Sequence, residues 1–341
     1  MKRTFAIVTV LAIVLVAVVQ LRHHHRTEPA RASVAAPRQP TAVPSKNIVF
    51  KSPKMAVVVN PGEKPVRRAR PVAFNPKGNV WSDIGLIVND NADYRKRLEA
   101  IGRLPAKLTD ADWGLLRDFL LKPDELDSDQ LGQVLKNEIM DRLCLMDPMP
   151  GGLGDVLGQI YRNLRQNEVV RDYALQHVAT MDEVLAQSGG KSIGREEQAD
   201  QKVLWSAINE SGDSIAGTAL LGLERLSEEP KAKVDQSKVA DTALKLANDS
   251  VAGELTRITA YEVCAQMDVQ DALPVIEAAA QNSQTVSLQI SAIGALGLMG
   301  GANEIPVLQN LAHGGNERLQ LPVQAAIQRI EQRAQAPAKS I

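Results

Sequence analysis

The chain has 341 residues, of which 44% are hydrophobic, 3% are aromatic and two are cysteines, so it holds one elongated repeat domain or two compact ones plus tails. Its formal net charge of −1 hides an asymmetry: residues 22–80 carry 12 Lys or Arg against two Glu, whereas residues 81–341 carry 25 basic and 38 acidic side chains, a charge of −13. A basic tail on an acidic body with few aromatic rings argues against nucleic-acid binding, and we expect no nucleic-acid partner.

Residues 5–21 form an apolar run with only two polar members. A helix of that length covers about 25 Å, slightly less than a hydrocarbon core of roughly 30 Å, and the flanking basic side chains can snorkel to close the gap. We expect residues 1–26 to be an uncleaved anchor that contacts the membrane through residues 5–21. A cleaved secretory signal and a cytoplasmic chain are the alternatives. The run is longer than a signal core, and no small-x-small site comes before Arg22.

The membrane orientation is weakly specified, because Lys or Arg lie on both sides of the apolar run. We expect a single-pass protein with a short cytoplasmic N-terminus and an exported body, on the periplasmic side of the inner membrane if the source is bacterial. The neighbouring His23 to His25 are interpreted as a solvated flank, because three consecutive residues offer no fixed metal geometry.

Residues 27–80 are expected to be a Pro-rich, basic, disordered linker. They hold nine of the 18 prolines and show no sustained helical period. Within them, Lys54–Asn60 is either a strand that pairs with a partner or an apolar patch in the tether. The basic group Arg67–Arg70 is either a contact for anionic lipid or the acidic body, or simply solvated.

From Trp81 onward the hydrophobic period becomes helical, and the end of the chain repeats itself. Asp271–Ala280 aligns with Asn303–Ala312 at an offset of 32 residues, and Leu288–Leu296 aligns with Leu319–Ile327 at an offset of 31. A fixed period of this size is typical of stacked helical pairs, in which each unit buries its apolar face against its neighbours.

Further helices are expected upstream of this repeat, and the first unit reads as incomplete. Thr109 is the expected cap of the second of these helices. With the aligned segments they make about six helical pairs. The upstream helices are expected at residues 94–104, 113–121, 130–146, 153–164, 169–178, 203–208, 219–226, 243–247 and 258–264.

These repeats resemble the HEAT-repeat family, closest to short bacterial HEAT-like units, over about residues 91–333. Pro274 and Pro306 fit the family habit of a proline in the opening turn of the first helix, whereas Pro322 predicts a kink or a late start. The resemblance implies an all-α fold, an α-solenoid of antiparallel helical pairs over residues 81–336 with a tail at 337–341. It also implies an arc whose inner face, lined by the second helices, grips another protein.

No catalytic motif comes with the resemblance, and no catalytic, cofactor-binding or metal-binding residue is assigned. His177 and His313 stand in no ligand spacing, and His177 on an apolar stripe is expected to be a packed core residue. Cys144 and Cys264 are expected to be single buried thiols, since they lie about three units apart. The partner-binding residues are not identified by the sequence.

Three loops superficially suggest ligand sites. Asp124–Gln130 lacks the Gly and the distant Glu of a calcium loop, so an acidic helix-capping turn is favoured. Gly151–Gly154 lacks the Lys-Ser/Thr end of a phosphate loop and is interpreted as a helix-to-helix turn. Gly189–Gly194 is interpreted as a loop between units, because no strand precedes it.

The sequence therefore favours a membrane-tethered helical-repeat scaffold that binds a protein partner through the solenoid surface and is not an enzyme. One alternative is a small-molecule-binding or lyase-like enzyme, since some proteins with short HEAT-like repeats resemble bilin lyases. The other is a structural spacer in an envelope assembly.

Overall fold

The structure is a computed structural model that describes residues 82–123, 130–188 and 196–335. The chain divides into two units, Met1–Ala73 and Phe74–Ile341, and all described residues belong to the second. Across these three ranges every regular element is a helix, which confirms the all-helical repeat fold.

The helices alternate between a first and a second member of a pair, and we use these two terms below. The first helices are α2 (Asp83–Ile87), α4 (Asp110–Leu121), α6 (Leu153–Arg162), α8 (Glu196–Ala207), α10 (Gln236–Asn248), α12 (Leu273–Asn282) and α14 (Ile305–His313). The second helices are α3 (Tyr94–Gly102), α5 (Gln130–Cys144), α7 (Glu168–Ser188), α9 (Ile215–Ser227), α11 (Glu254–Gln266), α13 (Val286–Met299) and α15 (Glu317–Gln335). Two 3-10 turns, η1 (Gln270–Ala272) and η2 (Ala302–Glu304), lead into α12 and α14.

The described residues thus contain seven pairs rather than about six, because α2 completes the first unit. This helix has only five residues, too few to show a helical period in the sequence. Ser82 caps it by accepting a hydrogen bond from the Gly85 N–H at 3.2 Å, and Ile84 and Ile87 bury its apolar side.

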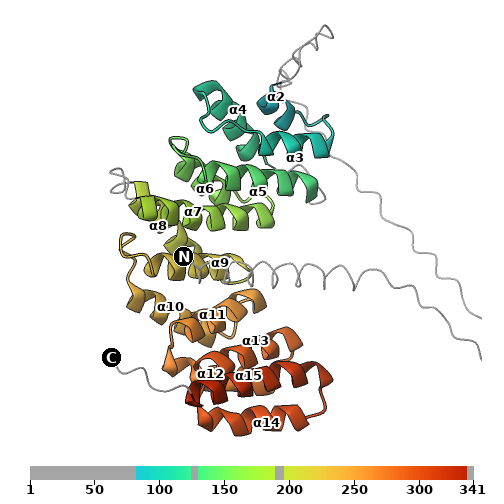
Figure 1. The fold of residues 1–341 in the computed structure, drawn as a ribbon, viewed down its shortest axis with the longest axis vertical. Coiled ribbons are helices and arrows are strands. Elements are labelled where there is room, and N and C mark those ends of the chain that lie inside the picture. The colour runs from blue at the N-terminus through green and yellow to red at the C-terminus, as the bar shows by residue number, and fades with distance from the viewer. Residues whose placement is uncertain (1–81, 124–129, 189–195, 336–341) are drawn as a thin grey trace, which may run out of the picture. The chain divides into compact units, whose positions relative to one another are not determined.

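The second helices form a continuous layer within this unit (Figure 1). Each contacts the next in chain order, from α3 with α5 through to α13 with α15. The first helices pack against this layer, as α6 does on α7 and α12 on α13. One side of the second helices is therefore covered by first helices, and the opposite side is left open.

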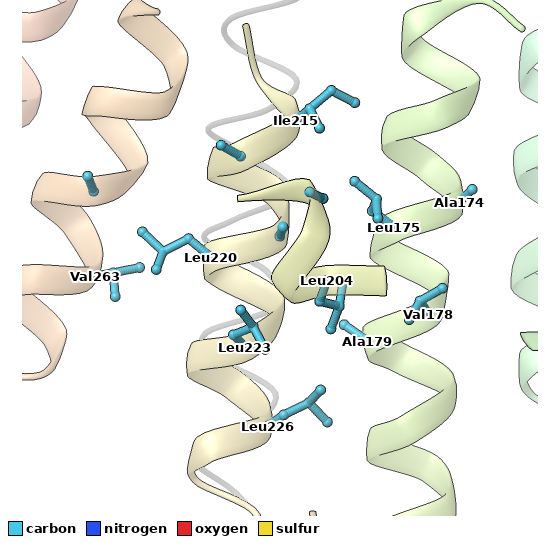
Figure 2. Close-up of a cluster of buried hydrophobic side chains, with 14 of the residues drawn as sticks. Ala174, Leu175, Val178, Ala179, Leu204, Ile215, Leu220, Leu223, Leu226 and Val263 are labelled. Carbon is cyan, nitrogen blue, oxygen red and sulfur yellow. The ribbon is translucent and has the colours of Figure 1, made fainter. Parts of the chain in front are cut away.

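The core between these layers consists of aliphatic side chains from neighbouring pairs. Figure 2 shows Leu175 of α7 on the side that faces Leu204 of α8 and Leu223 of α9, with Val263 of α11 on the other side of α9. These side chains are less than 9% exposed, and burying each stabilises the fold by about 1.5–3 kcal/mol relative to leaving it in water.

Buried arginines join the two helices of a pair at two places. Arg97 and Arg171 each occupy the fourth residue of a second helix. The Arg97 Nε donates to the Ile87 carbonyl at 2.8 Å, and the Arg171 Nε donates to the Tyr161 carbonyl at 2.7 Å. Both carbonyls lie at the end of a first helix, where no helical N–H remains to bond them.

Two of the three prolines lie where predicted, and for Pro322, where a kink or a late start was predicted, the helix has already begun. Pro274 and Pro306 are the second residues of α12 and α14, as expected for an opening turn. The late start predicted at Pro322 is wrong, because α15 begins at Glu317 and continues through the proline. Leu319 and Val323 are buried on either side of Pro322, and this burial holds the turn despite the missing N–H.

The N-terminal predictions fall outside this part of the molecule. Residues 5–21 and 27–80 are not among those that the structure describes, so the anchor and the linker stay predictions, as do the domain boundaries. None of the described helices is long and apolar enough to cross a membrane.

Candidate functional site

His177 is a core residue, as the sequence predicted. Its side chain is 7% exposed, and its Nε2 lies 3.0 Å from Asn137 Oδ1 on α5. Burial lowers the pKa of His177 to about 4, because it penalises the charged imidazolium. The ring is therefore neutral at physiological pH and packs in the core as an uncharged side chain.

The other histidine and the two cysteines also occupy structural positions. His313 is exposed at the end of α14, with Nδ1 2.6 Å from the Gln309 carbonyl of the same helix. Cys144 and Cys264 are free and buried, which confirms the prediction of single thiols. Burial raises the pKa of each to about 12, so neither is an activated nucleophile.

Of the three loops, only one lies within the described residues. Gly152 precedes α6 with φ of +75°, in a turn that leads from α5 into α6, as predicted for Gly151–Gly154. Residues 124–129 of the acidic loop and all of Gly189–Gly194 lie outside the described ranges. Within those ranges no group of three His, Cys, Asp or Glu side chains is arranged to hold a metal ion.

The open side of the second helices carries an unusual share of exposed apolar residues. Among the described residues, ten large hydrophobic side chains are exposed, and seven of them lie on second helices or one residue beyond. We call this surface the second-helix face; its apolar members are Leu131, Val134, Leu145, Val169, Ile290, Leu298 and Leu321. Single exposed leucines are common on protein surfaces, but a concentration on one side is typical of an interaction surface.

A hollow of about 290 Å³ opens on this face between α3 and α5. Its apolar wall is formed by Leu98 and Ile101 of α3 and by Val134 of α5. Gly102 forms part of the lining, and no atom lies within 4 Å of the place where its Cβ would stand. The volume is small for a drug-sized ligand.

Two carboxylates line the rest of this hollow, and other acids lie on the second helices α9 and α11. Glu138 and Asp141 of α5 are in the lining, and within the described part of the chain neither makes a hydrogen bond or an ion pair through its carboxylate. Burial raises the pKa of Asp141. Burial, aided by Glu228 and Glu262, raises the pKa of Glu224 on α9 to about 7, and burial alone raises that of Glu262 on α11.

A second hollow of about 320 Å³ lies between the α6–α7 turn and the α8–α9 turn. The arginine in its lining, Arg171, is already paired. The Arg171 guanidinium contacts Glu210 at 2.6 Å, and the Tyr161 hydroxyl donates to the same carboxylate at 2.5 Å. Burial acts to raise the pKa of Glu210, but these two hydrogen bonds outweigh it and lower that pKa. The arrangement is a satisfied network that joins two units.

Comparison with known proteins does not place the chain in a family. No family model matches it, and no curated protein does. A solved structure of human deoxyhypusine hydroxylase in complex with glycerol is 15% identical with a TM-score of 0.30, and the match covers 73% of this chain and 95% of that one. Two engineered proteins are 17% and 16% identical, each with a TM-score of 0.37; these matches cover 73% of this chain and 95% and 68% of theirs. At these TM-scores the likenesses carry no argument about this chain's activity.

The expectation that the chain is not an enzyme needs correction. It was drawn from the absence of a catalytic motif in a helical-repeat sequence. One of the matched solved structures is that of a hydroxylase, and the expectation is not carried further.

The sequence analysis identified no partner-binding residue, yet α5 carries a detectable signal. Leu131, Val134, Glu138, Asp141 and Leu145 recur at helical spacing on one side, while Leu135, Ile139 and Leu143 form the buried side. Apolar residues thus lie on an exposed stripe as well as on the buried one, which is more than a helix needs for its own core. That excess is the signal that sequence reasoning missed.

Proposed function

We propose that this chain is a protein-interaction scaffold of the HEAT-like repeat class and that it binds its partner through the second-helix face. The observation that carries the proposal is the concentration of exposed large apolar side chains on that side. Removing such a patch from water on binding stabilises a complex in proportion to the apolar area buried.

The proposal includes a tether: residues 5–21 hold the scaffold on a membrane, with the helical body on the exported side. The apolar run with basic flanks supports it. We would express the full chain in bacteria and add protease to intact spheroplasts. Digestion of the body while a short anchored fragment survives is the expected result, and a body that is clipped only after lysis would refute the orientation.

The binding surface is tested by co-purification of the tagged full chain from membranes of the cells that naturally produce it. The test variant places charge on the second-helix face through Val134→Glu, Ile290→Glu and Leu298→Glu. The matched control adds the same charge to exposed positions of first helices through Leu115→Glu, Ala278→Glu and Gln309→Glu.

We expect the control to retain the proteins that co-purify with the natural chain and the test variant to lose them, because buried charge without a partner is costly at an interface. Both variants are first shown to have the natural helical circular dichroism. If the control variant loses the co-purifying proteins and the test variant retains them, the interaction lies on the first helices and the proposal is overturned.

A further inference from the structure

We propose that the partner presents a basic segment to the second-helix face and that one of its lysine or arginine side chains enters the hollow between α3 and α5. This inference rests on the proposed function and names the chemistry of the partner. It follows from how the hollow combines an apolar wall with unpaired negative charge.

The apolar wall fits the stem of a long basic side chain. Leu98, Ile101 and Val134 line a space of about 290 Å³, and the open position above Gly102 leaves room beside them. Lysine and arginine bury their methylene stems on such surfaces while the charged head reaches a polar group. A short acidic or polar side chain would leave this wall in contact with water.

The carboxylates fit the charged head of the same side chain. Glu138 and Asp141 lie three residues apart on α5, so both reach the same side of the helix. Among the described residues their carboxylates have no hydrogen-bond or ion-pair partner. A bound ammonium or guanidinium between them supplies the missing charge, and guanidinium is able to bond carboxylates in pairs.

Arg142 also lines the hollow but does not neutralise these carboxylates. Its Nη2 donates to the Leu104 carbonyl at 3.4 Å, beyond the end of α3, and no ion pair links it to either acid. The titratable groups of the lining are therefore two acids and one arginine directed elsewhere. The hollow keeps a net negative charge.

The wider charge distribution favours the same partner. Residues 81–341 carry a formal charge of −13, with 25 basic and 38 acidic side chains. Such a surface attracts a basic segment over distances of about a Debye length and repels an acidic one.

The test measures binding of a fluorescein-labelled hexa-arginine peptide to the purified full chain in detergent, by fluorescence anisotropy. Hexa-citrulline serves as the uncharged probe of the same shape. We expect hexa-arginine to bind and Glu138→Gln with Asp141→Asn to weaken it about tenfold, as for close charge pairs at an interface. Gly102→Leu, which fills the hollow, is expected to weaken binding to a similar extent.

Two controls separate the hollow from the general acidity of the body. Asp241→Asn with Glu277→Gln removes the same two charges from first helices α10 and α12, and Gly102→Ala leaves the hollow open. Both are expected to bind hexa-arginine within twofold of the natural chain. If the first control weakens binding as much as the α5 double variant, or if Gly102→Leu has no effect, the hollow is not the site and the proposal fails.

Failure here is distinguishable from failure of the scaffold proposal. The co-purification test uses the natural partner and apolar positions on the same face. A partner lost with the apolar variant but bound equally by the α5 charge variant would leave the scaffold proposal standing and refute the basic segment.

Discussion

At the scale of single residues, the buried titratable groups make stability depend on pH in opposite directions. His177 is neutral in the core, with its pKa lowered to about 4 from an ordinary value of 6.5. Below pH 6.5 the unfolded chain binds a proton that the folded chain refuses, so this residue destabilises the fold as the pH falls from 6.5 towards 4.

We predict that His177→Gln, which keeps a donor for Asn137, reduces the loss of stability between pH 7 and pH 4.5. The upper bound is about 3 kcal/mol, set by the size of the pKa shift. Urea unfolding of both proteins at the two pH values measures it. An equal loss in both proteins would show that the ring is protonated without penalty.

Glu224 acts in the other direction. Its side chain is 6% exposed, and its pKa is raised to about 7, so the folded chain holds a proton that the unfolded chain releases above about pH 4.5. Stability from this group is fully present below pH 4.5 and is lost as the pH rises through 7.

We predict that Glu224→Gln stabilises the fold by about 1 kcal/mol at pH 8 and has little effect at pH 4, after allowing for screening by solvent. Thermal unfolding at the two pH values measures the difference. The exposed Asp241→Asn on α10 is the control, and an equal gain from both changes would contradict the burial argument.

At this scale the sequence predicted the roles that depend on local pattern and missed those that depend on tertiary packing. His177 on an apolar stripe and two distant cysteines were predictable from local pattern. Asn137, 40 residues from His177, became its partner only through packing of α5 on α7. The local sequence predicts Glu224 to be an ordinary surface acid, whereas the structure buries it on α9.

At the scale of helices, close approach in the second-helix layer depends on glycine at particular positions. A Cβ on Gly297 of α13 would lie 2.8 Å from Ala326 Cα of α15, whereas a Cβ on Gly294 of the same helix would meet no atom within 4 Å. Two glycines three residues apart therefore have opposite roles.

We predict that Gly297→Ala destabilises the fold by about 1–3 kcal/mol, because α15 must move away. Gly294→Ala is predicted to stabilise it by about 0.5–1 kcal/mol, because alanine is the better helix former and fits without contact. Circular dichroism melts of the two variants check this. A loss of stability in both would refute the assigned packing of α13 on α15.

The helices were largely predictable, and their ends were not. Each helix expected from the 3.6-residue period is present, and the offsets of 31 and 32 residues correctly paired α12 to α15. The expected helix at 169–178 continues as α7 to Ser188, and α8 begins at Glu196, well before Val203. Helix ends depend on tertiary contacts, which the periodic pattern does not encode.

At the scale of the whole molecule, stacking explains which surface is available for binding. Most second helices pack against a first helix on one side and against their neighbours along the layer, so a stripe of the layer stays open. The repeat period predicts the stack. It does not predict that exposed apolar residues gather on the open side, because that depends on which stripe the packing buries.

The most direct test of the central claim places a photocrosslinking amino acid in the full chain, in the cells that naturally produce it. Leu145 and Leu298 probe the second-helix face, and Leu115 and Gln309 probe exposed positions on first helices. The account predicts that the same protein is crosslinked from Leu145 and Leu298 and from neither control position. Crosslinking from Leu115 or Gln309 alone would contradict it.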